Sequence, residues 1–229
     1  MPNKLVVLEF NELTPDLMTR FIDEGVLPNF ERLRNESLVC ISEADEEPPL
    51  LEPWIQWVTV HTGLPYAEHK VFDLGDGAKL DAPRIWDVLG QRGDKVWICG
   101  SMNASFRRPI DGFILPDPWS TGISPYPDGE FTDYLDFVRL NVQEHTRASI
   151  PVSKSAQLRF LSFMVKHGMS LETVKSIARQ LMSERGGGNR WKRATLLDDL
   201  QWDVFCSYWK RCSPDFSTFF LNSTAHFQH

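Results

Sequence analysis

The chain has 229 residues, of which 42% are hydrophobic and 24% are charged, as is typical of a globular protein with a substantial core. Its formal net charge of −7 argues against a nucleic-acid-binding surface, because such surfaces are built from clustered Lys and Arg. No apolar run reaches the length of a membrane span, and the first residues lack the pattern of a secretory signal. The four cysteines are widely spaced and indicate buried thiols. We therefore expect a cytoplasmic protein with no nucleic-acid or membrane partner.

The first part of the chain predicts a strand followed by a helix. Residues 4–10, KLVVLEF, form an apolar run that is typical of a parallel strand buried on both faces. Thr14 is suited to cap a helix that has Pro15 at its first position and stops at Gly25. This is the pattern of a βα unit.

The next stretch predicts short helices and two further strands. Helices are expected at 28–34, 54–62 and 85–91, and an acidic loop with several prolines precedes the second of them. Strands are expected at 95–100, KVWICG, and at 113–115.

From residue 129 onward the sequence predicts consecutive helices. They are expected at 131–144, 156–166, 171–183 and 191–210. Because this stretch is far longer than an ordinary α/β crossover, it indicates an inserted helical subdomain or cap. Residues 216–221, FSTFFL, then predict a last strand.

The predicted fold class is therefore α/β, a three-layer sandwich with a mostly parallel central sheet and an inserted helical subdomain. Residues 1–128 would form the first part of the α/β core, residues 129–211 the insertion or cap, and residues 212–229 the return to the sheet.

Two groups of side chains in the predicted insertion are also informative. An aromatic stripe is expected to pack in the core or between the insertion and the sheet, and it comprises Trp191, Trp202, Phe205 and Trp209. A short basic cluster is expected to be a solvated loop and helix start, and it comprises Arg185, Arg190, Lys192 and Arg193.

Polar residues lie where the first and last strands end, which is where ligands collect in open α/β sheets. Glu9 and Asn11 share one side of the first strand by its two-residue period. Asn222 and His226 follow the last strand. We expect Glu9 and His226 to be functional, whereas Asn11 suits a site residue and a turn former equally.

Three stretches fit one known pattern in chain order. NELTPD at 11–16 with LPNF at 27–30 fits a strand end and the helix after it, and TVHTG at 59–63 with Pro65 and His69 fits a helix that ends in Thr-Gly. NSTAH at 222–226 fits Asp-x-x-Gly-His, with Asn for Asp and Ala for Gly. In these features the chain resembles the alkaline-phosphatase-like superfamily, and within it the type I phosphodiesterase and nucleotide pyrophosphatase branch. The resemblance covers about residues 4–116 and 214–229.

The resemblance implies two divalent metal ions that activate a hydroxyl nucleophile for displacement at phosphorus or sulfur. Residue by residue, metal ligands of the family fall on Asn11, Asn222 and His226, and of these His226 is unaltered. The nucleophile falls on Pro53 or Glu52, neither of which carries a hydroxyl. The family also continues with further Asp and His ligands, so either this chain is the N-terminal part of a longer protein or the resemblance ends at its C-terminus.

The altered residues change the expected chemistry. Asn in place of Asp removes negative charge, which Glu9, Glu12 or Glu52 could restore, and Asn carbonyls suit Ca²⁺ or Mg²⁺ better than Zn²⁺, with Mn²⁺ also possible. Glu52 could act as a nucleophile or a general base, with its pKa raised if Leu51 and Trp54 bury it.

Three functions are compatible with these residues. The first is a metal-dependent hydrolase of small phosphate or sulfate esters, most like a phosphodiesterase. The second is a catalytically degenerate relative that binds a phosphorylated or glycosylated ligand, and the third is an interaction module whose helical region contacts a partner.

Overall fold

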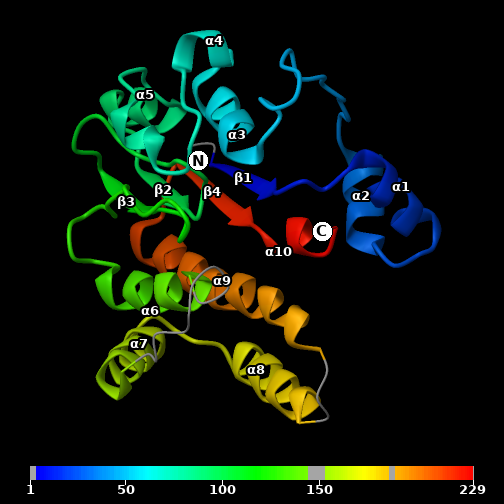
Figure 1. Cartoon of the computed structure of the whole chain (residues 1–229), viewed down its shortest axis with the longest axis vertical. Helices are drawn as coiled ribbons and strands as arrows, with labels where there is room; N and C mark the ends of the chain where they lie inside the picture. The colour runs from blue at the N-terminus through cyan, green and yellow to red at the C-terminus, as the bar shows by residue number, and fades with distance from the viewer. Residues whose placement is uncertain (1–3, 144–152, 186–188, 229) are drawn as a thin grey trace.

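The computed structural model describes residues 4–143, 153–185 and 189–228 and shows an α/β fold around a four-stranded sheet (Figure 1). The strands are β1 (Leu5–Phe10), β2 (Val96–Cys99), β3 (Gly112–Leu115) and β4 (Phe216–Leu221). They lie in the order β1-β4-β2-β3, and every neighbouring pair is parallel. The last strand of the chain therefore lies in the middle of the sheet, between β1 and β2.

Helices connect these strands in two groups. The first group, between β1 and β2, comprises α1 (Pro15–Asp23), α2 (Pro28–Glu36), α3 (Pro53–Thr62), α4 (Tyr66–His69), the 3-10 helix η1 (Asp76–Lys79) and α5 (Ile85–Gln91). The second group, between β3 and β4, comprises α6 (Thr132–Gln143), α7 (Lys154–Lys166), α8 (Leu171–Glu184), η2 (Arg190–Lys192) and α9 (Arg193–Cys212). The short α10 (Ser223–His226) follows β4.

The alternation of side chains along β2 builds the three layers. Val96 and Ile98 pack with Trp86 of α5 on one face of the sheet, whereas Trp97 and Cys99 belong to the core of the opposite face. Successive strand residues point to opposite faces, so a strand that is apolar throughout can serve two cores. The predicted three-layer α/β fold is confirmed.

The helices of the second group share the core of that opposite face. Side chains of α6 and α9 pack directly on the sheet around Trp97, which stacks on Phe131 and Phe205 with ring centroids 5.7 and 6.2 Å apart. Helix α7 packs on α6 and α8 packs on α9, so these two helices lie farther from the sheet (Figure 1). The predicted helices at 131–144, 156–166, 171–183 and 191–210 agree with α6 to α9 within a few residues.

The prediction that the first strand is buried on both faces is wrong. Leu5, Val6 and Leu8 are 54%, 41% and 48% exposed, and β1 lies at one edge of the sheet with β4 as its neighbour. Only at its carboxyl end does β1 enter the interior of the described structure, where Glu9 is 1% exposed. An apolar run indicates a strand, but it does not show whether other elements cover both faces of that strand.

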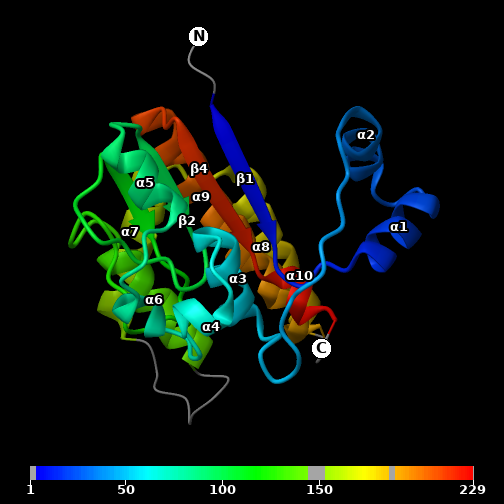
Figure 2. The ribbon, with the colours of Figure 1, turned by 90° about the horizontal axis from the view of Figure 1, so that it is seen from above.

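Helices α1 and α2 form a hairpin that stands away from the sheet (Figure 2). The predicted cap is confirmed, since the Thr14 hydroxyl accepts a hydrogen bond from the Leu17 backbone N–H at 3.3 Å and Pro15 follows it. Within the described hairpin, Ile22 is the buried residue. Phe10 and Phe30 connect the hairpin to the end of β1, with ring centroids 5.2 Å apart.

Two smaller features complete the description. Cys99 is buried and Cys206 and Cys212 are half-buried, but Cys40 is exposed, which corrects the prediction of four buried thiols. None of the helices in the described ranges is long and apolar enough to cross a membrane.

Candidate functional site

The predicted site residues Asn11 and Asn222 meet at the carboxyl edge of the sheet. They are 211 residues apart in sequence, yet Asn11 Nδ2 donates a hydrogen bond to Asn222 Oδ1 at 2.9 Å. They meet because β1 and β4 are neighbours in register, with Phe10 opposite Leu221, and each Asn is the next residue along its strand. We call this contact the amide pair.

A tryptophan sets the orientation of the amide pair. Trp57 on α3 donates from its indole Nε1 to Asn11 Oδ1 at 3.0 Å. Because an indole N–H can only donate, it identifies the oxygen of Asn11 and turns the Asn11 amino group toward Asn222. Asn11 is 2% exposed, so both ends of its side chain are engaged inside the protein.

The chain around the amide pair is held by further side-chain contacts. The Thr224 hydroxyl donates to the Asn11 carbonyl at 2.6 Å. Asp198 of α9 accepts from the backbone N–H groups of Asn222 and Ser223 at 3.3 and 3.1 Å. Burial raises the pKa of the Asp198 carboxyl, and these N–H donors oppose that rise. Asp198 therefore fixes the turn from β4 into α10.

Glu9 lies deeper, at the centre of a buried polar network. One carboxylate oxygen is 2.8 Å from His61 Nε2, and the other accepts from the Ser101 hydroxyl at 2.7 Å. Ser101 also lies 2.7 Å from the Thr218 hydroxyl. These four side chains are between 0% and 6% exposed. Burial of a carboxylate is costly unless it is hydrogen-bonded, and both oxygens of Glu9 are.

The order of groups in this network differs from that of a catalytic triad. In a triad the imidazole lies between the hydroxyl and the carboxylate, and it removes the proton from the hydroxyl. Here Glu9 lies between Ser101 and His61. The arrangement is suited to holding β1, α3 and the end of β2 together.

The other two predicted site residues are exposed. Glu52 is the N-cap of α3 and makes no side-chain cap hydrogen bond there. Leu51 beside it is 44% exposed, so the burial predicted for Glu52 is not found. His226 ends α10, and its ring lies 6.2 Å from that of Trp119. The structure thus brings Glu9, Asn11 and Asn222 to one interior region and leaves Glu52 and His226 at the surface.

Asp117 is a buried carboxylate that the sequence analysis did not select. It follows β3, is 0% exposed, and accepts from the backbone N–H groups of Trp119 and Ser120 at 3.0 and 2.9 Å. Burial raises its pKa to about 6 although these hydrogen bonds act in the opposite direction. The signal in the sequence was its place between Pro116 and Pro118, directly after a predicted strand.

The donor set at this edge does not fit a pair of divalent metal ions. Asn11 Oδ1 accepts from Trp57, Asn222 Oδ1 accepts from Asn11, and the two Glu9 oxygens contact His61 and Ser101, so Glu9 is the one carboxylate among these three predicted ligands. In the described ranges no group of three or more His, Cys, Asp or Glu side chains is arranged to hold a metal ion. Two neutral amides also supply none of the negative charge that paired dications require.

Comparisons of the chain with protein-family models, with curated proteins and with solved structures give no match.

Proposed function

We propose that this chain is a ligand-binding protein on a hydrolase-like α/β fold, in which the carboxyl edge of the sheet binds a phosphorylated or glycosylated ligand and does not cleave it. The observation that carries the proposal is the amide pair, in which Asn11 donates to Asn222 at 2.9 Å. It occupies the position where the resemblance to the alkaline-phosphatase-like superfamily implies carboxylate metal ligands.

The electrostatics of the amide pair support binding without metal. Two carboxylates at hydrogen-bonding distance repel each other unless a cation lies between them. Two amides attract each other, because one supplies an N–H and the other an oxygen. The Asn11–Asn222 contact is therefore stable without a cation, and Trp57 completes it on the other side.

The exposed residues beyond the amide pair have the chemistry of ligand recognition. His226 lies one helical turn from Asn222, since its backbone N–H bonds the Asn222 carbonyl at 3.3 Å. Its imidazole can donate to phosphate or sugar oxygens, and the half-buried Trp119 beside it offers an apolar ring face. An amide, an imidazole and an indole form a surface suited to a polar ring or a phosphate group.

A metal-dependent hydrolase of phosphate or sulfate esters is the second candidate. The close approach of Asn11 and Asn222 favours it, because the resemblance places metal ligands at these two positions. In that case Glu52, exposed at the start of α3, would be the nucleophile or general base.

Restoring the acidic side chains separates the two candidates. We expect the double variant Asn11→Asp/Asn222→Asp to unfold at a lower temperature than the wild-type chain in chelator, because its two carboxylates repel each other. Millimolar Mn²⁺ should raise the unfolding temperature of the double variant and leave that of the wild-type chain unchanged. The control is Asn29→Asp/Asn35→Asp, which adds the same charge at exposed positions of α2 and should not respond to Mn²⁺.

The hydrolase reading makes the opposite prediction. Stabilisation of the wild-type chain by Mn²⁺, together with chelator-sensitive hydrolysis of bis(p-nitrophenyl) phosphate that Glu52→Gln abolishes, would overturn the proposal.

Ligand binding is measured by NMR titration with inorganic phosphate, glucose 6-phosphate and glucose. Shifts of the Asn222 and His226 signals in the wild-type chain, with loss of the Asn222 shift in His226→Ala, would support the proposal. Unchanged Asn222 and His226 signals in the wild-type chain would contradict it.

A further inference from the structure

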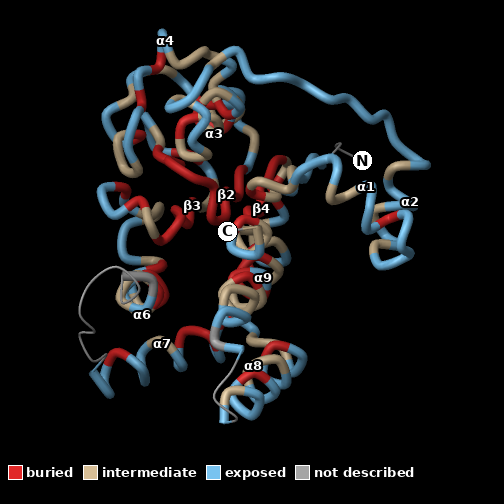
Figure 3. Tube along the Cα trace, turned by 45° about the vertical axis from the view of Figure 1, so that its right-hand side comes forward, coloured by how far each residue is buried: buried red, intermediate tan, exposed pale blue. Residues whose placement is uncertain are grey.

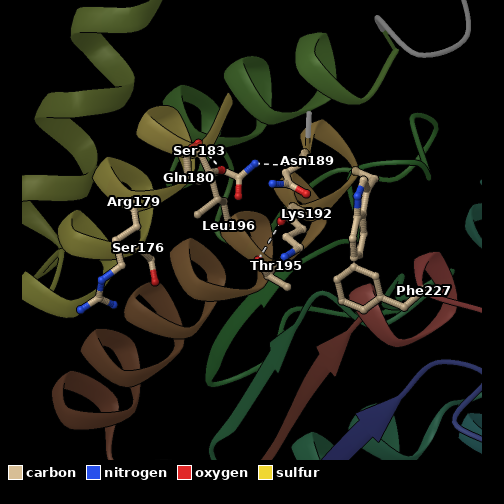
Figure 4. A pocket seen from close by; sticks show the side chains of 10 residues that line it. Ser176, Arg179, Gln180, Ser183, Asn189, Lys192, Thr195, Leu196 and Phe227 are labelled. Atoms are coloured by element: carbon tan, nitrogen blue, oxygen red, sulfur yellow. Dashed lines mark hydrogen bonds between the residues drawn. The ribbon is translucent and has the colours of Figure 1, made fainter. Parts of the chain in front are cut away.

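A groove of about 620 Å³ lies away from the amide pair, within the second group of helices (Figure 4). It runs between α8 and the start of α9, with η2 along one wall, and Phe227 closes one end. Neither the amide pair nor the network around Glu9 contributes to it. The groove is therefore separate from the site of the function proposed above.

The charge of the groove is opposite to that of the chain. Arg179 and Lys192 line it, and among the described residues that line it none is Asp or Glu, although the whole chain has 31 acidic and 24 basic residues. The nearby Glu184 accepts from Arg193 at 2.5 Å and from Gln180 at 2.9 Å, so its charge is engaged beside the groove. A groove with cations and without carboxylates favours an anion.

One wall of the groove is aromatic and exposed. Trp191 is 63% exposed and meets Phe227 edge to face, with ring centroids 5.3 Å apart. Lys192 Nζ lies 5.2 Å from the centroid of the Trp191 ring. Trp86 and Trp97 are instead fully buried. Trp191 therefore departs from the predicted core stripe, and its ring is available to stack on a flat group.

The floor of the groove is held in place by a buried amide. Gln180 is 8% exposed and donates to the backbone carbonyl of Asn189 at 2.7 Å. This contact connects α8 to the segment before η2, where Asn189 has a left-handed backbone with φ of 69°. The aromatic wall and the cations are thus presented from elements that are fixed to each other, as a preformed site requires.

We infer that this groove binds a small organic phosphate that carries a flat aromatic ring. The ring would stack at the end of the groove formed by Trp191 and Phe227, and the phosphate would lie at Lys192 beside Trp191. Arg179 lies farther along the groove, near Ser176, and adds positive charge there (Figure 4). An ammonium and a guanidinium both form charge-assisted hydrogen bonds with phosphate oxygens. Lys192 is exposed, as predicted for the basic cluster.

Calorimetric titration of the full chain tests this inference. The probes are AMP and flavin mononucleotide, which differ in their ring, together with adenosine and ribose 5-phosphate, which each carry half of the AMP chemistry. We expect AMP or flavin mononucleotide to bind, and which of them binds more tightly identifies the ring. Adenosine and ribose 5-phosphate should each bind at least about tenfold more weakly than AMP if AMP is the preferred ligand.

Matched variants locate the binding. Trp191→Ala and Lys192→Gln should each weaken it about tenfold, and both residues are exposed, so the fold should be retained. The controls are Leu158→Ala and Lys166→Gln, which alter exposed residues of α7, and both variants should bind as the wild-type chain does. Failure of both nucleotides to bind at millimolar concentration, or equal binding by wild-type, Trp191→Ala and Lys192→Gln chains, would overturn the inference.

Discussion

At the scale of single residues, the carboxyl edge of the sheet shows how a buried polar group is kept. Glu9 has both oxygens bonded, Asn11 has both ends of its amide bonded, and Asp117 receives backbone N–H donors. Leaving any of these groups unpaired would cost more stability than a single hydrogen bond contributes, because a buried group has no water to replace the missing partner.

Asp117 should make the free energy of unfolding depend on pH. Its pKa is about 6 in the folded chain, against an ordinary value of 3.8. As pH rises from about 4 to 6, the unfolded chain loses this proton first, so the contribution of Asp117 to stability falls by on the order of 3 kcal/mol. Below that window the contribution is fully present, and above it no further change is expected.

Urea unfolding of the wild-type chain and of Asp117→Asn across this pH window measures the effect. Asn keeps an oxygen for the Trp119 and Ser120 N–H groups, and it does not titrate. The difference between the two chains should therefore change with pH in the stated direction. A ¹³C NMR titration of Asp117 with a midpoint at or below pH 4 would contradict the prediction.

At the scale of elements, the helix and strand ends follow local chemistry. Thr14 and Pro15 begin α1, Pro53 begins α3, and Gly63 ends α3 in a left-handed conformation with φ of 70°. Gly112, the first residue of β3, is required for a different reason, the close approach of β2. A Cβ at this position would lie 1.9 Å from the carbonyl oxygen of Val96 in β2, so only glycine lets the two strands pair there.

Gly112→Ala should be far more destabilising than Gly25→Ala. Both glycines have positive φ, 146° and 73°, but a Cβ at Gly25 would meet open space. Gly25→Ala should therefore cost about 1 to 2 kcal/mol from backbone strain. Gly112→Ala should cost about 3 kcal/mol or more, because β2 and β3 must also separate. Chemical denaturation of the two variants measures the difference, and equal losses would show that the strand contact is not limiting.

At the scale of the whole molecule, burial is distributed unevenly. β2, β3 and β4 lie between two helical layers, whereas the edge strand β1 and the α1–α2 hairpin are largely exposed (Figure 3). Five of the six residues of β4 are buried, and none of the described residues of α2 is. Helices that bury little apolar surface open at low free energy.

Hydrogen exchange should follow this distribution. Amides of α1 and α2 should exchange much faster than those of α5, a shorter helix with Trp86 and Asp87 buried, and limited proteolysis should cut first within residues 37–52. Mass spectrometry of exchanged and cleaved chains provides both measurements. Protection of the hairpin equal to that of α5 would instead mean that another surface covers it in solution.

The amino-acid sequence by itself determined the elements and the fold class. Apolar runs located β1, β2, β3 and β4, and turn and cap residues located most helices, because these signals act over a few neighbouring residues. The one-turn helices α4 and α10 were not predicted, since four residues carry too little periodicity. The resemblance to a known family also selected Asn11 and Asn222 as partners of one site.

The tertiary structure alone decided which strands lie at the edges of the sheet and what each polar group contacts. Strand order depends on contacts between distant segments, such as β1 with β4, and no local pattern encodes it. For the same reason the sequence could select Glu9 and Asn11 but could not pair them with His61 and Trp57 on α3. Only the fold brings these distant side chains together, because their hydrogen bonds join segments that are far apart in the sequence.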